Sequence, residues 1–341
     1  MGISEKELRS SDLTISAVIA CYKDDQAIPI MYERLVKVFV ELKVKYEIIF
    51  VNNNSPDNTE EVLASICEKD ANVTAIMHSR SFQSQSSFLS GMQMSTGDAV
   101  VLLDGDLQDP PELIPQFVEK WRAGFDVVYG SRIKRDTSFV LNFFYKLFYR
   151  IFREVSYIPM PVNAGDFSLM DRRVVNEIIA LPETDPFMRG LRAWVGFKQT
   201  GVDYVRPKRM FGESTNNWHR NFWWAKKAIF SFSFIPLELL TYGGVFLTFI
   251  SFFAGIFQIV YRILHPELPH GVSLIIVLIL FFGGIQLLAI SIIGEYMAKV
   301  LEETKRRPKF IRRSILYKGK SIAKTSEIEN IMDDIRAKTK N

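Results

Sequence analysis

Short apolar runs alternate with helix-like segments through the first 135 residues of the chain. The runs are rich in β-branched residues and bounded by polar or turn-forming residues, which is typical of buried strands. They cover residues 14–20, 46–52, 73–78, 99–103 and 126–129. The segments between them have helical patterns, at 28–42, 59–69, 86–94 and 111–121. This order predicts an α/β domain with a mostly parallel sheet that is covered on both faces.

Two later stretches contain no Asp, Glu, Lys or Arg, at residues 239–261 and 271–294. Each is about 23 residues long, and about 20 apolar residues suffice to cross the hydrocarbon core of a bilayer. The pattern therefore predicts two transmembrane helices, at about 237–262 and 271–296. A transporter is disfavoured, because these helices carry no internal ionisable residue that could line a pathway.

Two further segments have the pattern of membrane-interface contacts. Residues 139–155 combine a Phe-rich face with a basic stripe, which is typical of a helix lying in the plane of the interface. Ahead of the first apolar stretch, aromatic residues are interleaved with basic ones. The first segment places Asn142, Lys146, Arg150 and Arg153 on one face, and the second contains Trp218, Arg220, Phe222, Trp223, Trp224, Lys226 and Lys227. We expect both segments to dock the soluble domain against the bilayer.

Composition and charge support this organisation. The 341 residues are 48% hydrophobic with a formal net charge of +4, which excludes a disordered chain. Basic residues gather at 299–313, after the second apolar stretch, so we interpret the charge as a membrane-surface signal and expect no nucleic-acid partner. The positive-inside rule then places both termini in the cytoplasm. The polar residues 1–11 do not resemble a signal peptide, and Cys21 and Cys67 form no disulfide framework.

The expected domains follow from these boundaries. Residues 1–228 form a cytoplasmic catalytic domain that includes the interfacial helix, 229–300 form the membrane domain, and 301–341 form a basic cytoplasmic tail. An amphipathic helix is expected in the tail at about 328–335, without an assigned function.

Polar loops follow the first, second and fourth predicted strands, and ligands bind beyond the carboxyl ends of strands in such sheets. Asp104 and Asp106 lie two residues apart in extended chain and point to the same side. Gly105 between them leaves the backbone accessible to a ligand. Two carboxylates with open coordination positions suit Mg²⁺ or Mn²⁺, completed by phosphate oxygens of a substrate. The alternative, an Asp-Gly turn with solvated carboxylates, is disfavoured by the neighbouring polar loops.

Several motifs resemble the family 2 glycosyltransferases of the GT-A fold. The resemblance covers about residues 14–300 and is carried by Val101-Leu102-Leu103-Asp104-Gly105-Asp106-Leu107-Gln108-Asp109-Pro110-Pro111-Glu112, Tyr129-Gly130-Ser131-Arg132 and Gly165-Asp166-Phe167. Within that family the chain is similar to dolichol-phosphate mannose synthases and, more closely, to GtrB-type bacterial enzymes that load glucose onto undecaprenyl phosphate. The resemblance implies a GT-A (Rossmann-like) domain followed by interfacial helices and two transmembrane helices.

The same resemblance implies the activity. It points to an inverting transfer of a sugar, with glucose favoured, from a UDP-sugar to polyprenyl (undecaprenyl) phosphate at the cytoplasmic membrane face. Asp104, Asp106 and Gln108 would surround the divalent metal, Mg²⁺ or Mn²⁺, and the diphosphate.

Two loops of this chain depart from the family pattern. The family usually has Pro-x-Tyr-Asn-Glu in the first loop, where this chain has Ala20-Cys21-Tyr22-Lys23-Asp24, and Asp-Asp-x-Ser-x-Asp in the second, where this chain has Asn52-Asn53-Asn54-Ser55-Pro56-Asp57. Amides both donate and accept hydrogen bonds and therefore match uracil, whereas carboxylates only accept and suit guanine. UDP is thus favoured over GDP, and a GDP-mannose-dependent mannosyltransferase is the alternative. By resemblance, Ala20, Tyr22, Asp24 and Asn53 contact the nucleotide sugar.

Charge that builds on the leaving diphosphate must be neutralised, and a divalent ion with arginine side chains can do this. Arg132 follows the fifth predicted strand, and Arg209 begins an R-x-x-G-E-S string that resembles the family's mobile loop. The resemblance assigns Arg132 and Arg209, together with Asp104, to the nucleotide sugar. It assigns Arg132, Lys208, Arg209 and Ser214 to the acceptor or its phosphate.

Asp166 is the catalytic base that the resemblance implies. However, a phosphomonoester has its second pKa near 6, so polyprenyl phosphate is already mostly dianionic at neutral pH and hardly needs deprotonation. The alternative is that Asp166 orients the acceptor or stabilises charge on the sugar.

Three questions stay open at this level. A processive polysaccharide synthase is disfavoured, because Arg192-Ala193-Trp194 is a poor match to its Gln-x-x-Arg-Trp motif, and a non-catalytic sugar-nucleotide-binding membrane protein is a further alternative. The identity of the sugar rests on resemblance alone. Glycine pairs at 243–244 and 283–284 permit a homo-oligomer.

Overall fold

The computed structural model describes residues 13–133, 158, 161, 164–211, 226, 230–231, 233–264 and 272–339. The chain divides into a sheet-containing unit, residues 1–150, 158–221 and 307–341, and a helical unit, residues 151–157 and 222–306. The predicted interfacial helix at 139–155 lies outside the described residues, as does most of the aromatic and basic segment at 218–227.

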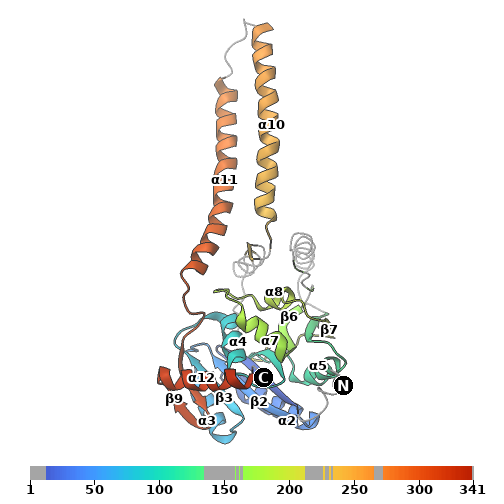
Figure 1. Cartoon of the computed structure of the whole chain (residues 1–341), viewed down its shortest axis with the longest axis vertical. Coiled ribbons are helices and arrows are strands. Elements are labelled where there is room, and N and C mark those ends of the chain that lie inside the picture. Colours follow the sequence, from blue (N-terminus) through green and yellow to red (C-terminus); the bar gives the residue numbers. More distant parts are fainter. Residues whose placement is uncertain are drawn as a thin grey trace. The chain divides into compact units, whose positions relative to one another are not determined.

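A single sheet of nine strands forms the centre of the first unit (Figure 1). The strand order in the sheet is β7-β5-β6-β4-β1-β2-β3-β8-β9. The bounds are β1 (Thr14–Cys21), β2 (Lys45–Asn52), β3 (Val73–His78), β4 (Ala99–Asp104), β5 (Val127–Arg132), β6 (Ala164–Asp171), β7 (Gln199–Tyr204), β8 (Arg312–Tyr317) and β9 (Lys320–Ile322). The predicted α/β class is confirmed, and each predicted strand is present.

The sheet is mixed, whereas a mostly parallel sheet was predicted. The pairs β1–β2, β1–β4, β2–β3 and β5–β7 are parallel, and the pairs β3–β8, β4–β6, β5–β6 and β8–β9 are antiparallel. The reason is that β6 inserts between β4 and β5 against their direction, and β8 returns from the far end of the chain. Their partners are distant in sequence, so no local pattern reveals these two pairings.

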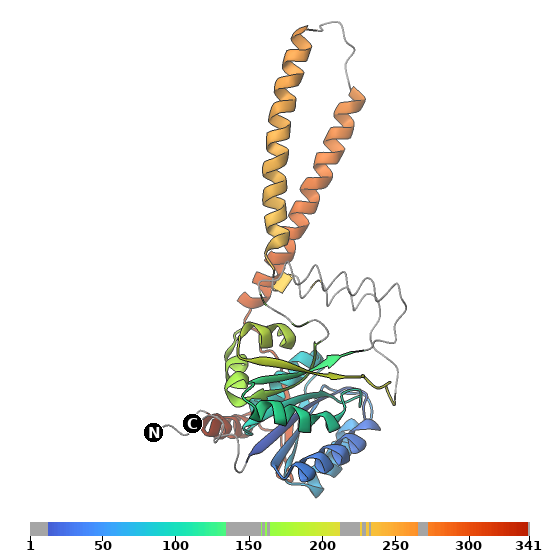
Figure 2. The same cartoon turned by 90° about the vertical axis from the view of Figure 1, so that its right-hand side faces the viewer.

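Helices cover both faces of the sheet (Figures 1 and 2). One face contacts α2 (Ala27–Leu42), α3 (Thr59–Lys69) and α5 (Ile114–Arg122), and the other contacts α4 (Gln83–Met94), α7 (Arg172–Ala180) and α8 (Met188–Trp194). The short η1 (Pro111–Leu113) packs against α2 and α5, and α12 (Thr325–Thr339) packs against α4. Successive side chains of β1 point alternately to the two faces of the sheet, so the strand packs against both layers of helices. Ile15, Ala17 and Ile19 belong to the main core, while Val18 lies under Gly91 of α4. Burial on both faces explains the nearly continuous apolar strands of the sequence.

The C-terminal residues are part of this sheet, which corrects the prediction of a separate tail at 301–341. Strand β8 pairs with β3 from Ala75↔Leu316 to His78↔Arg312, and β9 continues the sheet. Helix α12 buries Ile328, Met332 and Ile335, as expected for the amphipathic pattern there. The strand was not recognised in the sequence, because two arginines begin β8 and its apolar stretch is short.

Two long helices make up most of the described part of the second unit, α10 (Ile235–Leu264) and α11 (Val272–Thr304). Each contains a 27-residue stretch apolar and long enough to span a membrane, and the apolar residues of these stretches are not buried within the protein. Near the start of α10, Lys226 Nζ lies 2.8 Å from Glu295 Oε1 of α11, and the Tyr296 hydroxyl donates to the Ser233 carbonyl at 2.8 Å. The two helices are therefore joined at one end.

Candidate active site

The carboxyl ends of the parallel strands bring the polar loops to one edge of the sheet. Strands β1, β2, β4, β5 and β7 end at Cys21, Asn52, Asp104, Arg132 and Tyr204. Strand β6 runs the other way, so it begins at this edge. Its register pairs Leu102 with Ser168, and continuing that register by two residues places Asp166 opposite Asp104. Residues from six strands and their loops therefore share one rim, as predicted for the first, second and fourth strands.

The loops after β1 and β4 touch through Gly105. Its amide donates to the Ala20 carbonyl at 3.0 Å. A Cβ at this position would lie 2.9 Å from Asp24 Oδ2 and 3.1 Å from the Ala20 carbonyl oxygen. Glycine is therefore required by close approach, and this contact brings Asp24 next to the pair of Asp104 and Asp106.

Acidic side chains in this cluster outnumber their close partners. Burial, with the charges of Asp109, Asp106 and Asp166, holds the pKa of Asp104 well above its usual value. Burial raises the pKa of Asp24 to about 6, partly offset by a hydrogen bond from the Tyr22 amide. The cluster thus carries unbalanced negative charge, which favours a cation.

Two arginines approach this cluster from the segment after β7. Arg206 Nη2 lies 3.9 Å from both Asp104 Oδ2 and Asp106 Oδ2. Arg209 lies 3.3 Å from Asp24 through Nη2 and 3.7 Å from Asp106 through Nε. These distances are longer than those of a good charge-assisted hydrogen bond. Arg206 was missed in the sequence, where its only signal is its place three residues before Arg209.

The residues fit a divalent cation. No group of three or more His, Cys, Asp or Glu side chains with metal-binding geometry occurs in the part of the chain that the structure describes. Mg²⁺, however, usually takes one or two carboxylates together with substrate phosphates, and Asp104 and Asp106 supply two with excess negative charge. The side-chain Nε2 of Gln108 donates to the Pro207 carbonyl at 3.1 Å. This side chain therefore also holds the loop that carries the two arginines.

Arg132 is positioned by a buried network. Its Nε donates to the Tyr204 hydroxyl at 3.2 Å, and that hydroxyl donates to Asp109 Oδ1 at 3.0 Å. Arg132 Nη2 lies 4.0 Å from the same carboxylate. A Cβ on Gly165 would meet Arg132 Nη2 at 2.9 Å. Arg132 is therefore held against the start of β6, beside Asp166.

Asp166 is paired on both oxygens. Arg189 donates to Oδ1 through Nε at 3.1 Å and to Oδ2 through Nη2 at 3.2 Å, and Gln85 Nε2 donates to Oδ2 at 3.1 Å. Burial alone would favour the neutral acid, but the charges of Arg189 and Arg192 and these hydrogen bonds lower the pKa of Asp166 below its usual value. A carboxylate so stabilised is a weak base, which favours the predicted alternative of an orienting or charge-stabilising group. Gln85 and Arg189 were missed in the sequence because both act through proximity alone.

Asn52 at the end of β2 and Asn53 after it are buried, whereas Asn54 is exposed. Asn53 accepts from the Phe82 amide at 2.8 Å and donates to Ser81 at 3.1 Å, and Asn52 accepts from the Ser55 amide at 2.8 Å. Recognition of uracil by these amides requires that they face a ligand, and the contacts of Asn52 and Asn53 within the protein do not support that prediction. Among the remaining predicted residues, Tyr22 and Lys208 are exposed, and Ser214 lies outside the described residues.

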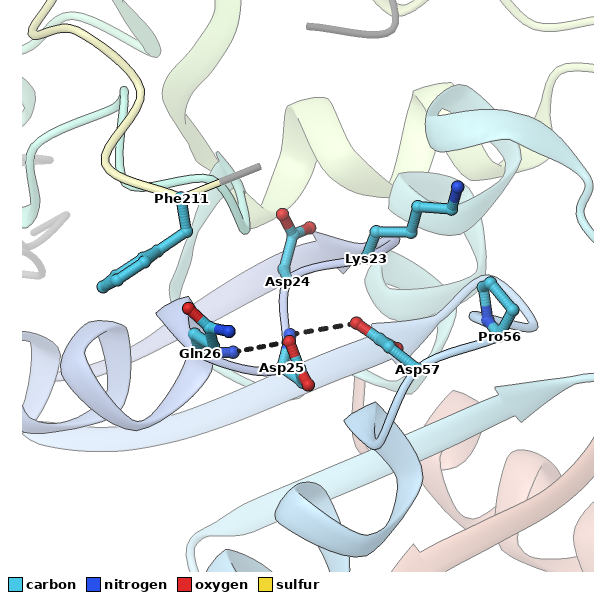
Figure 3. Close-up of a pocket in the computed structure, with 7 residues that line it drawn as sticks. All are labelled: Lys23, Asp24, Asp25, Gln26, Pro56, Asp57 and Phe211. Atoms are coloured by element: carbon cyan, nitrogen blue, oxygen red, sulfur yellow. Dashed lines mark hydrogen bonds between the residues drawn. The ribbon is translucent and has the colours of Figure 1, made fainter. Parts of the chain in front are cut away.

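A pocket of about 240 Å³ lies beside the acidic cluster, and Figure 3 shows the side chains around it. Asp24 and Phe211 connect it to the cluster and to the arginine segment. The Asp25 amide donates to Asp57 at 3.2 Å, which joins the loops after β1 and β2. The lining residues are Lys23, Asp24, Asp25, Gln26, Pro56, Asp57 and Phe211.

Comparison with known proteins identifies the family. The model of glycosyl transferase family 2 matches residues 16–179. An uncharacterized glycosyltransferase of Synechocystis sp. is 40% identical over 88% of this chain and 94% of its own length. The chain belongs to glycosyltransferase family 2. A further relative of this family 2 glycosyltransferase is the bactoprenol glucosyl transferase of Shigella phage SfV, 38% identical over 88% of this chain and 98% of that protein.

Solved structures include two proteins that are similar to this family 2 glycosyltransferase at low identity. One is a mannosyltransferase from Pyrobaculum calidifontis in complex with GDP-Man and Mn²⁺, at 17% identity, 60% coverage of each chain and a TM-score of 0.42. The other is glucosyl-3-phosphoglycerate synthase from Mycobacterium tuberculosis in complex with Mn²⁺, UDP and glucosyl-3-phosphoglycerate, at 17% identity, 67% coverage of this chain and 82% of that one, and a TM-score of 0.42.

Proposed function

We propose that this glycosyltransferase moves glucose from UDP-glucose to a polyprenyl phosphate, with inversion at the anomeric carbon, at a membrane surface. The observation that carries the proposal is the rim itself, where carboxylates with excess negative charge face two arginines and lie beside Asp166. The relatives named bactoprenol glucosyl transferase, 38% identical over nearly their whole length, support the sugar and the lipid class.

The donor is proposed to lie between the β1, β2 and β4 loops. The base would occupy the pocket beside Asp57 and Phe211, and the diphosphate would lie against Asp104 and Asp106. These carboxylates, with the carbonyl oxygen of Gln108, would hold Mg²⁺ or Mn²⁺, which when bound offsets charge on the diphosphate. Arg206 and Arg209 are close enough to the carboxylates to meet the same phosphate oxygens.

The acceptor is proposed to enter on the Asp166 side. In an inverting transfer, a phosphate oxygen of the lipid forms a bond to the anomeric carbon while the bond from that carbon to the UDP oxygen breaks. The attacking phosphate is mostly dianionic at neutral pH, so no protein base is required. Asp166 and Arg132 would orient the phosphate and the sugar, and the fixed ion pair with Arg189 keeps that geometry rigid.

The membrane placement follows from the second unit. Helices α10 and α11 would span the bilayer, and the basic residues at 299–313 would hold that end of α11, with both termini, in the cytoplasm. A lipid acceptor would then be reached from the membrane that anchors the enzyme. A homo-oligomer through the glycines of these helices is part of the same proposal, tested by crosslinking in the membrane.

The experiment is transfer of radiolabel to lipid by the full chain in membranes. We expect label from UDP-glucose in the organic phase when undecaprenyl phosphate and Mg²⁺ or Mn²⁺ are present, and none with EDTA. UDP-galactose, UDP-N-acetylglucosamine and GDP-mannose are the matched donors. Transfer only from GDP-mannose would overturn the donor proposal, and no lipid-linked label from any donor would overturn the function. The anomeric configuration of the product tests the inversion.

A further inference from the structure

Helix α4 reaches the active site through its first turn. Gln85 is buried, donates to Asp166 Oδ2 through Nε2 at 3.1 Å, and accepts from the Met188 amide of α8 through Oε1 at 2.8 Å. One side chain therefore ties together α4, α8 and β6. The position of α4 decides whether Gln85 can make both bonds.

Arg312 forms hydrogen bonds with the C-terminal part of the same helix. Its Nη2 donates to the Ser90 carbonyl at 3.0 Å and to Gln93 Oε1 at 3.1 Å, and its Nε donates to Ser90 Oγ at 3.2 Å. The guanidinium also lies 4.8 Å from the centre of the Phe310 ring. A cation at a helix C-terminus interacts favourably with the helix dipole, so Arg312 fixes this end of α4 by charge and by geometry.

The surrounding C-terminal segment encloses α4. Strand β8 places Arg312 opposite His78 in the sheet, and Phe310 stacks on the His78 ring at 5.6 Å. Helix α12 contacts α4 directly. On its other side α4 packs so tightly that a Cβ on Gly91 would lie 2.3 Å from Val18 Cγ1. A helix enclosed in this way moves as a rigid rod, and Ser90 lies about 7.5 Å along the axis from Gln85.

We propose that Arg312 is a positioning residue for the transfer reaction, which it supports by holding α4 so that Gln85 keeps Asp166 in place. The inference rests on the proposed function of the Asp166 side. Arg312 follows the end of α11 at Thr304 by eight residues. The segment that leaves the apolar helix is therefore the one that fixes the helix beneath Asp166.

The test is a double-mutant cycle on the full chain in membranes, with transfer to undecaprenyl phosphate as the readout. Arg312→Met keeps the aliphatic stem and removes the three hydrogen bonds, and Gln85→Met removes the bonds to Asp166 and Met188. We expect Arg312→Met to lower kcat about tenfold with the KM for the nucleotide sugar unchanged, because the donor loops do not contact it. In the Gln85→Met background, Arg312→Met should cause no further loss.

The neighbouring arginine is the matched control. Arg313 lies on the same strand, is about half exposed and pairs with Glu60, so Arg313→Met should keep the wild-type kcat within twofold. Arg312→Lys retains the charge and should restore most of the rate. If Arg312→Met does not fold, the same cycle with Arg312→Lys should show a smaller loss that Gln85→Met again abolishes.

Two results separate the claims. Unchanged kcat in Arg312→Met, or a loss that adds fully to that of Gln85→Met, overturns the positioning role while wild-type transfer stands. No transfer by the wild-type chain overturns the proposed function on which that role rests.

Discussion

The two sides of the active site treat their carboxylates in opposite ways. On the β1 and β4 side, the arginine nitrogens nearest to Asp104 and Asp106 lie 3.7 to 3.9 Å away, and Asp106 accepts one hydrogen bond, from the backbone amide of Gln108 at 3.1 Å. The pKa of Asp104 is raised by burial and like charge. On the β6 side, Asp166 accepts three hydrogen bonds at 3.1 to 3.2 Å, and its pKa is lowered.

This difference indicates that one side of the site binds a cation and that the other side fixes the geometry of the reacting groups. A carboxylate with excess negative charge around it gains by binding a metal ion and a diphosphate. A carboxylate that is already neutralised gains nothing from a cation and is a weak base, but it is rigid. The predictions that follow test the two sides against each other, in order of decreasing expected effect.

The largest effect is expected on the acidic side. Asp106→Ala should lower the transfer rate about a thousandfold, because charge on the leaving diphosphate would lose its metal. Initial rates at saturating Mg²⁺ or Mn²⁺ measure this loss. Glu60→Ala, which removes a carboxylate from a surface ion pair with Arg313, should keep the wild-type rate. A rate for Asp106→Ala within tenfold of wild type would contradict the assignment.

Arg206 should matter on the same side, by a smaller factor. Arg206→Met should raise the KM for the nucleotide sugar about thirtyfold with a smaller change in kcat. Arg206 Nη2 lies 3.9 Å from the carboxylates of Asp104 and Asp106, so its charge is close to the proposed position of the diphosphate. Arg122→Met is the control, since Arg122 is an exposed arginine in the last turn of α5, at the opposite edge of the sheet from the rim. Equal KM values for the two variants would remove Arg206 from the donor site.

Asp166→Asn should cost only about tenfold, because an amide keeps the shape of the side chain and the acceptor phosphate needs no base. The pKa of Asp166 lies below that of an ordinary aspartate side chain, so the wild-type carboxylate is ionised throughout the neutral pH range. The pH profiles of wild type and Asp166→Asn between pH 6 and 8 should therefore have the same form. A collapse of activity with donor binding intact would instead establish an essential carboxylate.

The last prediction concerns stability and stands outside the order of the rate effects. The pKa of Asp24 is raised to about 6, so the folded chain holds this proton more tightly than the unfolded chain does. Its contribution to stability is complete below about pH 4 and is lost as the pH rises through 6. Asp24→Asn should therefore raise the free energy of unfolding at pH 8 by on the order of 3 kcal/mol, with no gain at pH 4. Denaturant unfolding of both proteins at the two pH values tests this, and equal stability at pH 8 would contradict it.

The sequence predicted the local parts of this fold well. Helix α3 spans the expected residues 59–69, because it buries one face whose helical period is visible in the chain. Strand β3 spans the expected 73–78, because it is a short, fully buried run bounded by polar residues. Strands β6 to β9 were not predicted. The partner of β8 lies more than two hundred residues away, and such pairing is decided by packing of the folded sheet rather than by any local period.

The active site divides in the same way. Asp104 and Asp106 could be predicted from their spacing at a strand end, and the structure places Asp24 and Arg209 beside them. Gln85 lies 81 residues from Asp166, and nothing in a Ser- and Gln-rich helix marks one glutamine as a contact. Asn53 shows the reverse case, because its place in a promising loop did not reveal that its side chain faces the protein.

The most direct test of the difference between the two sides is calorimetric binding of UDP to the full chain, with and without Mn²⁺. The account predicts that wild type binds UDP only with the metal, that Asp106→Ala abolishes this binding, and that Asp166→Asn retains it. Metal-independent binding by wild type, or equal loss in both variants, would contradict it.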